Sequence, residues 1–195
     1  MIAGGATRSI LLAGVGGQGI LRASDILSSV FMEAGLDVKK SEVHGMAQRG
    51  GCVTSHVRYG RKVFSPLALK ADVDILLAFE KLETLRYLDY LKKDGCVIIN
   101  DQEILPPAVN LGDLAYPADI VDTVKAAFPA SKVVHGENLA RKAGNARTVN
   151  TVLLGALSAF LTEIDLSIWE KVLKNSFAAK LTKVNLDAFH LGRSA

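Results

Sequence analysis

The stretch S-I-L-L-A-G-V-G-G-Q-G-I, from Ser9 to Ile20, decides the fold of this chain. An apolar strand over residues 9–13 leads directly into a glycine-rich turn, and a helix with one apolar face follows over residues 20–33. Glycines allow a tight turn and a close backbone approach, and the free N–H groups at a helix start favour an anion. The G-x-G-x-x-G spacing from Gly14 to Gly19 therefore indicates either a phosphate-binding loop or a tight strand-to-helix junction.

Outward from this stretch, apolar strands alternate with amphipathic helices. Strands are expected over 36–41, 52–59, 74–79, 96–100 and 132–135, and helices over 80–93, 120–128, 137–142, 146–162, 167–177 and 181–189. This alternation is typical of a three-layer α/β/α Rossmann-like fold with a mainly parallel sheet. Residues 62–65 are expected to form a hairpin with strand 52–59, which makes the sheet mixed. We expect one domain over 1–195, with a core at about 8–162 and a helical C-terminal extension at 163–195.

The composition is ordinary for a water-soluble protein. The chain has 195 residues, of which 49% are hydrophobic and 22% charged, with a net charge of +3. Its basic residues are scattered, which argues against nucleic acid as a partner. Its apolar runs are far too short to cross a membrane, and its N-terminus has no signal-peptide pattern. We therefore expect a cytoplasmic protein.

The cysteine count limits the cofactors that this chain can hold. It has two cysteines, Cys52 and Cys96, whereas a cubane iron–sulfur cluster normally takes four cysteine ligands. No metal-ligand spacing of histidine or cysteine is found either. We expect no metal site on this chain.

A second informative stretch is S-E-V-H-G-M-A-Q-R-G-G, from Ser41 to Gly51. It carries many polar groups between glycines, and loops on a rigid scaffold often hold binding residues. Its candidate residues are His44, Met46, Gln48 and Arg49. The guanidinium of Arg49 is suited to binding a phosphate or carboxylate, or to an ion pair across an interface. An exposed hairpin loop without a ligand is the alternative interpretation.

A third stretch, G-N-A-R-T-V-N-T-V-L-L-G-A-L, runs from Gly144 to Leu157. Asn145 is a good helix N-cap. Arg147 then lies in the first helical turn, where a positive charge opposes the helix dipole. Its position suggests a ligand or a partner for the guanidinium, with packing at the helix start as the alternative.

Together, the three stretches resemble one protein family. They are similar to the small (beta) subunit of indolepyruvate:ferredoxin oxidoreductases, which is equivalent to the gamma subunit or domain of the 2-oxoacid (pyruvate/2-oxoglutarate):ferredoxin oxidoreductase family. The resemblance extends over residues 10–161 and weakens beyond. It implies an enzyme subunit, inactive alone, within a holoenzyme that oxidatively decarboxylates an aryl 2-oxoacid such as indolepyruvate to an acyl-CoA and reduces ferredoxin.

The resemblance also implies partners and a site. Thiamine diphosphate, Mg²⁺ and the [4Fe-4S] clusters would lie on a large partner subunit, with coenzyme A as co-substrate and ferredoxin reached through the holoenzyme. No catalytic residue is expected on this chain. The expected residues of a coenzyme A pocket or partner interface are Gly16, Gly17, Gln18, Gly19, His44, Met46, Gln48, Arg49, Asn145 and Arg147. A surface suited to a partner also allows a homodimer of the isolated chain.

Three alternatives remain open from the sequence. The glycine spacing also fits a stand-alone NAD(P)-dependent Rossmann oxidoreductase, but Lys39 and Lys40 occupy the place where a ribose-binding acid is needed. The chain could instead be the gamma subunit of a pyruvate- or 2-oxoglutarate-type enzyme. A scaffold without ligand contact is the third.

Overall fold

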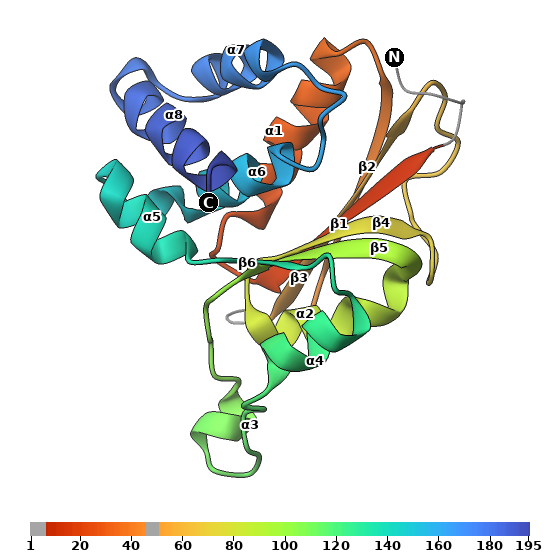
Figure 1. Ribbon diagram of the computed structural model, residues 1–195, viewed down its shortest axis with the longest axis vertical. Helices are drawn as coiled ribbons and strands as arrows, with labels where there is room; N and C mark the ends of the chain where they lie inside the picture. The colour runs from red at the N-terminus through yellow and green to blue at the C-terminus, as the bar shows by residue number, and fades with distance from the viewer. Residues whose placement is uncertain (1–6, 46–50) are drawn as a thin grey trace.

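Six strands form one mixed sheet in the order β2-β3-β1-β4-β5-β6 (Figure 1). The computed structural model describes residues 7–45 and 51–195. The strands are β1 Arg8–Val15, β2 Asp37–His44, β3 Cys52–Gly60, β4 Val73–Ala78, β5 Leu91–Asn100 and β6 Lys132–Val134. Pairing is parallel between β1 and β4, β4 and β5, and β5 and β6, whereas β3 is antiparallel to both β1 and β2. The predicted mixed, mainly parallel sheet is confirmed.

The antiparallel element differs from the expected hairpin. Residues 62–65 form no strand, and β3 lies between β2 and β1. Both edges of β3 are thus occupied, one by β1 and the other by β2. The following loop is held instead by side chains, since Asp37 Oδ2 accepts from the Val63 N–H at 2.9 Å and Arg58 donates to the Leu67 carbonyl at 3.0 Å.

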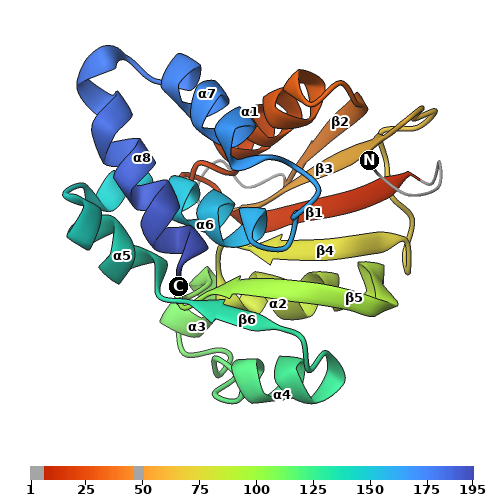
Figure 2. The same ribbon diagram turned by 45° about the horizontal axis from the view of Figure 1, so that its top comes forward.

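Helices cover both faces of the sheet (Figure 2). They are α1 Ile20–Glu33, α2 Lys81–Tyr87, α3 Pro107–Asn110, α4 Ile120–Ala127, α5 Gly136–Ala143, α6 Val149–Ser158, α7 Leu166–Ser176 and α8 Ala179–Arg193, with short 3-10 helices at Leu88–Tyr90 and Ala146–Thr148. α2 and α4 lie on one face, and α1, α5, α6, α7 and α8 lie on the other. The predicted three-layer arrangement is confirmed. Within residues 7–45 and 51–195, no helix has the length and apolar character to cross a membrane.

Two predicted helix boundaries were wrong. The helix expected over 80–93 ends at Tyr87, because Leu91 already pairs with Val73 at the start of β5. The helix expected over 146–162 begins as a 3-10 turn and ends at Ser158. In both places, pairing and packing with distant residues override a continuous helical pattern.

The alternating side chains of β1 build a core on each face of the sheet. Ile10 and Leu12 pack toward the larger helical layer, and Leu11 and Ala13 pack toward α2 and α4. The C-terminal helices belong to the larger layer, because Trp169 of α7 and Phe189 of α8 are fully buried in its core.

The contact between α6 and α8 depends on glycine. A Cβ on Gly192 would lie 1.9 Å from the Val152 carbonyl oxygen, and one on Gly155 would lie 2.0 Å from the Phe189 carbonyl oxygen. The two backbones therefore touch. This close crossing fixes the position of α6, and hence of Arg147 just before it, relative to α8.

Candidate functional site

The glycine turn after β1 is a tight junction at the carboxyl edge of the sheet. Gly17 and Gly19 have φ angles of 98° and 78°, which side chains rarely adopt. Gly19 is the N-cap of α1. The Gly16 N–H donates to the Gly51 carbonyl at 3.0 Å, so this turn lies against the start of β3.

Gln18 ties the turn to the neighbouring strands. Its Oε1 accepts from the Val15 N–H at 2.7 Å, and its Nε2 donates to the Phe79 carbonyl at 2.8 Å. The same Nε2 lies 3.0 Å from Gln102 Oε1. The amide thus fixes the ends of β1 and β4, and the junction interpretation of the glycine spacing holds for this residue.

The third sequence stretch meets the glycine turn in space. Asn145 Oδ1 accepts from the Arg147 N–H at 3.0 Å, which confirms its predicted N-cap role, although the element that it caps is a 3-10 turn. Asn150 Nδ2 lies 3.5 Å from the Gly19 carbonyl oxygen, across 131 residues of sequence. A Cβ on Gly19 would come within 2.8 Å of that same nitrogen, so glycine is needed for this approach.

A cleft of about 430 Å³ lies where the two stretches meet. It is lined by Gly17, Gln18, Gly19, Gln102, Ala146, Arg147, Val149 and Asn150. Arg147 is exposed, and its guanidinium forms no ion pair within the described part of the chain. The free N–H groups and the dipole of α1 give a positive potential at its start. The first turn of α1 carries no acidic residue that would neutralise this potential. The cleft is therefore suited to an anionic group.

The structure brings only part of the predicted site together. Gly17, Gln18, Gly19 and Arg147 line the cleft, while Gly16 and Asn145 support it from the turn and the cap. The backbone of His44 ends β2 and pairs with Val53, and nothing is described of its side chain. Met46, Gln48 and Arg49 lie outside the described residues.

The sequence interpretation missed Gln102 and Val149, and it did not assign Asn150. Gln102 comes just after β5, and polar residues after parallel strands gather at the carboxyl edge of a sheet, which is the signal that could have found it. Asn150 lies within the third stretch, but no pattern in the sequence indicates its contact with Gly19.

The position of β3 removes support for the dinucleotide alternative. A Rossmann site needs the second strand beside the first, so that an acid at its end reaches the ribose. Here β3 separates them, which places β2 about 10 Å from β1 at two strand spacings. Lys40 is also engaged, because it forms ion pairs with Asp25 and with Glu42, the latter at 2.7 Å.

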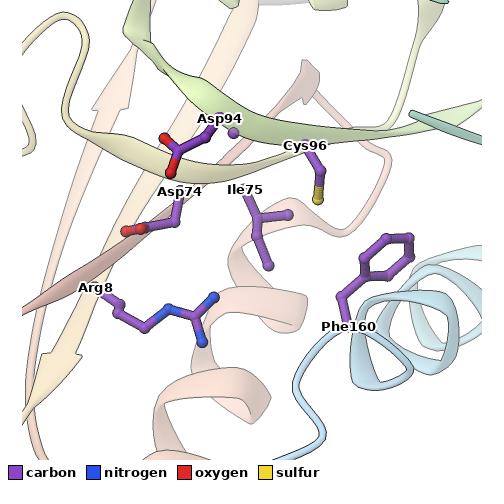
Figure 3. Close-up of a pocket in the computed structure, with 7 residues that line it drawn as sticks. Arg8, Asp74, Ile75, Asp94, Cys96 and Phe160 are labelled. Atoms are coloured by element: carbon purple, nitrogen blue, oxygen red, sulfur yellow. The ribbon is translucent and has the colours of Figure 1, made fainter. Parts of the chain in front are cut away.

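A smaller pocket of about 210 Å³ lies at the opposite edge of the sheet, beside Arg8, Asp74, Cys96 and Phe160 (Figure 3). Two of its charged side chains, Arg8 and Asp74, form ion pairs with Glu163 and Lys92. Arg8 Nη1 lies 2.7 Å from Glu163 Oε1, and Asp74 accepts from the Ser9 N–H at 2.7 Å. Burial raises the pKa of the Cys96 thiol to about 11, so this thiol stays protonated at neutral pH. These contacts stabilise the fold and engage both Arg8 and Asp74.

The described residues contain no cluster of three or more histidine, cysteine, aspartate or glutamate side chains that could hold a metal ion. Cys52 and Cys96 are free thiols on β3 and β5. The donor set for an iron–sulfur cluster is thus not found in this part of the chain.

Fold and cleft together define a class: a three-layer α/β domain with a cleft lined by an arginine at the carboxyl edge of its sheet. The profile of the pyruvate ferredoxin/flavodoxin oxidoreductase family matches residues 9–195. Indolepyruvate oxidoreductase subunit IorB of Thermococcus kodakarensis is 39% identical over 194 residues, covering 96% of this chain and 95% of that protein. The subunit of the same name from Archaeoglobus fulgidus is 36% identical over 187 residues, covering 94% and 92%.

A solved structure shares the fold. The 2-oxoglutarate:ferredoxin oxidoreductase from Magnetococcus marinus superimposes with a TM-score of 0.75 at 23% identity, covering 96% of this chain and 30% of that one. The chain therefore belongs to the pyruvate ferredoxin/flavodoxin oxidoreductase family, among the small subunits of 2-oxoacid:ferredoxin oxidoreductases. The resemblance seen in the three sequence stretches is confirmed.

Proposed function

We propose that this chain is the non-catalytic small subunit of an indolepyruvate-type oxidoreductase in the cytoplasm. Its large partner subunit would carry thiamine diphosphate, Mg²⁺ and the [4Fe-4S] clusters, and the holoenzyme would convert an aryl 2-oxoacid to an acyl-CoA with ferredoxin as electron acceptor. Identities of 39% and 36% to IorB subunits over nearly the whole chain support the indolepyruvate type. The lower identity of 23% to the 2-oxoglutarate enzyme argues against the alternative gamma subunit.

One observation supports the role of this chain: the guanidinium of Arg147, which has no ion pair among the described residues, lines the same cleft as the start of α1. Both features favour a negative group, and a guanidinium binds phosphate oxygens in a bidentate way. We assign the cleft to a phosphate-bearing part of coenzyme A, with the rest of the ligand on the partner subunit. The 2-oxoglutarate enzyme of the same fold has coenzyme A and succinyl-CoA bound, which is compatible with this assignment.

Thiamine diphosphate on the partner supplies the decarboxylation chemistry when bound. The residues of this chain bind and orient. Gln18 and Asn150 hold the glycine turn in place, so that the N–H groups of α1 and the Arg147 side chain converge on one anion. This arrangement fixes one end of a long, flexible ligand and lowers the entropy lost when its reactive end is positioned.

The reconstituted complex allows a direct test with Arg147→Ala. Losing a hydrogen bond to a charged group costs about 1.5–3 kcal/mol, and about 1.4 kcal/mol corresponds to a tenfold change. We therefore expect the KM for coenzyme A to rise about ten- to a hundredfold. The decarboxylation half-reaction and the affinity between the subunits should stay unchanged.

Arg141→Ala is the matched control, because Arg141 is exposed on α5 and pairs only with Glu137 in the described structure. The same assay applied to Arg49→Ala tests the loop residue. If Arg147→Ala weakens the association of the subunits and leaves the KM for coenzyme A unchanged, Arg147 belongs to the interface and its role in a coenzyme A pocket is rejected.

A further inference from the structure

A second pocket lies at the same edge of the sheet, on the face covered by α2. It has a volume of about 370 Å³, and its wall is mainly apolar, with Val15, Leu82, Ile104, Leu105 and Pro106 among the lining residues. Val15 ends β1 directly before the glycine turn. The pocket and the cleft are therefore neighbours on opposite faces of one strand end.

Two buried carboxylates lie in this pocket, and the first is fully engaged. Glu80 Oε1 accepts from the Tyr116 hydroxyl at 2.5 Å and from the Ile104 N–H at 3.2 Å. Its Oε2 accepts from the Glu83 N–H at 3.0 Å and so caps α2. Glu80 thus has a structural role.

Glu83 differs from its neighbour. Only 5% of this residue is exposed. Its Oε1 pairs with Arg86 Nε at 3.0 Å, whereas its Oε2 is buried and accepts no hydrogen bond from any described residue. A buried acceptor without a donor is destabilising. A donor entering from outside would remove that penalty.

One exposed leucine lines the pocket, and two more follow it on the same segment of the chain. Leu105, Leu111 and Leu114 are 44%, 78% and 66% exposed on the segment that carries α3 and projects from the body (Figure 1). Large apolar side chains gathered at a pocket mark a protein-binding surface. We call these three leucines and the pocket that Leu105 lines the α3 surface.

We propose that the α3 surface docks a segment of the large subunit, which inserts an apolar side chain and places a lysine or arginine nitrogen on Glu83 Oε2. The existence of that partner rests on the proposed function. Charge complementarity identifies the occupant, since the Glu83 oxygen that accepts no hydrogen bond from a described residue matches a cationic donor, and the apolar wall matches an aliphatic or aromatic side chain. Because the cleft and the α3 surface share one sheet edge, a single partner can cover both.

The test measures the Kd of the complex with the large subunit at pH 8, using two variants of the α3 surface. The double variant Leu111→Asp/Leu114→Asp changes only exposed positions, and Glu83→Gln removes the buried charge while keeping the shape. We expect each to weaken binding by tenfold or more. Circular dichroism checks that each variant is folded. The leucine variant changes no buried side chain, so its fold should be unaffected.

Two controls match these variants. Leu69→Asp changes a leucine that is 75% exposed on the loop between β3 and β4, away from the α3 surface. Glu137→Gln changes a carboxylate on α5, in the other helical layer. Both should leave the Kd within about twofold, as surface changes outside an interface usually do.

The outcomes separate this inference from the proposed function. If the wild-type chain binds the large subunit and both α3-surface variants bind equally well, the inference fails alone. If the wild-type chain does not bind the large subunit, both fail. If only the leucine variant binds the large subunit more weakly, the placement of a cation on Glu83 is wrong. If the isolated wild-type chain self-associates and the leucine variant does not, the surface binds a second copy of this chain and the proposed occupant is wrong.

Discussion

At the scale of single residues, half-buried Gln18 and buried Glu83 differ in how many of their polar atoms are hydrogen-bonded. Gln18 uses both its amide groups within the chain and stiffens the glycine turn. Glu83 leaves one oxygen without a donor among the described residues. A polar side chain whose atoms all form hydrogen bonds within the chain has a structural role, while a buried acceptor atom that lacks a hydrogen bond in a pocket indicates a place for a donor from a partner.

Glu83 should give the isolated chain a measurable pH dependence. Burial raises its pKa to about 7 from an ordinary value of 4.5, so the folded state holds this proton more tightly than the unfolded chain. Its contribution to stability is therefore present below pH 4.5 and is lost as the pH rises through 7. Relative to wild type, Glu83→Gln should be more stable at pH 8 by about 1–3 kcal/mol and should gain nothing at pH 4.

Urea denaturation of both proteins across this pH range provides the measurement. Taking the difference between the two cancels the titration of the other groups. Parallel stability curves for wild type and Glu83→Gln would show that Glu83 titrates normally in the fold.

At the scale of elements, strand and helix identities followed from local patterns, and pairing did not. The apolar spacing of residues 20–33 predicted α1 with its observed bounds. The expected hairpin of residues 62–65 was wrong, because β3 finds its partners in β2 and β1 through contacts that no local pattern records.

The site was predictable to a similar extent. Gly19 and Arg147 stood out by residue type and spacing, yet their meeting depends on a contact between Gly19 and Asn150 across 131 residues. Glu83 gave no signal at all, since a glutamate in a short polar helix is typical of a solvated face. Its burial arises only when α2 packs beneath the segment that carries α3.

The crossing of α6 and α8 gives a prediction at this scale. Gly192→Ala places a methyl group 1.9 Å from the Val152 carbonyl oxygen, so the helices must separate. Overpacking of this kind costs about 1–3 kcal/mol and exceeds the gain of about 1 kcal/mol in helix propensity. We expect a lower Tm and a lower free energy of unfolding.

Gly16→Ala is the control, since its Cβ would lie 3.8 Å from the Gly51 carbonyl oxygen, an ordinary contact. A Gly192→Ala protein as stable as wild type would mean that the close approach of α6 and α8 is not a constraint on the fold.

At the scale of the whole molecule, the two proposed binding surfaces share one edge of the sheet. They are the cleft lined by Arg147 and the α3 surface. At the opposite edge, a smaller pocket has its Arg8 and Asp74 side chains paired with Glu163 and Lys92. This arrangement fits a subunit that completes a larger enzyme, as its family membership indicates.

Reconstitution tests this central claim most directly. The chain and the large subunit are purified separately, and ferredoxin reduction by indolepyruvate and coenzyme A is measured for each alone and for their mixture. The account predicts no turnover by this chain alone, little by the large subunit alone, and full activity when the two are combined. Turnover by this chain alone, or undiminished activity of the large subunit without it, would contradict the account.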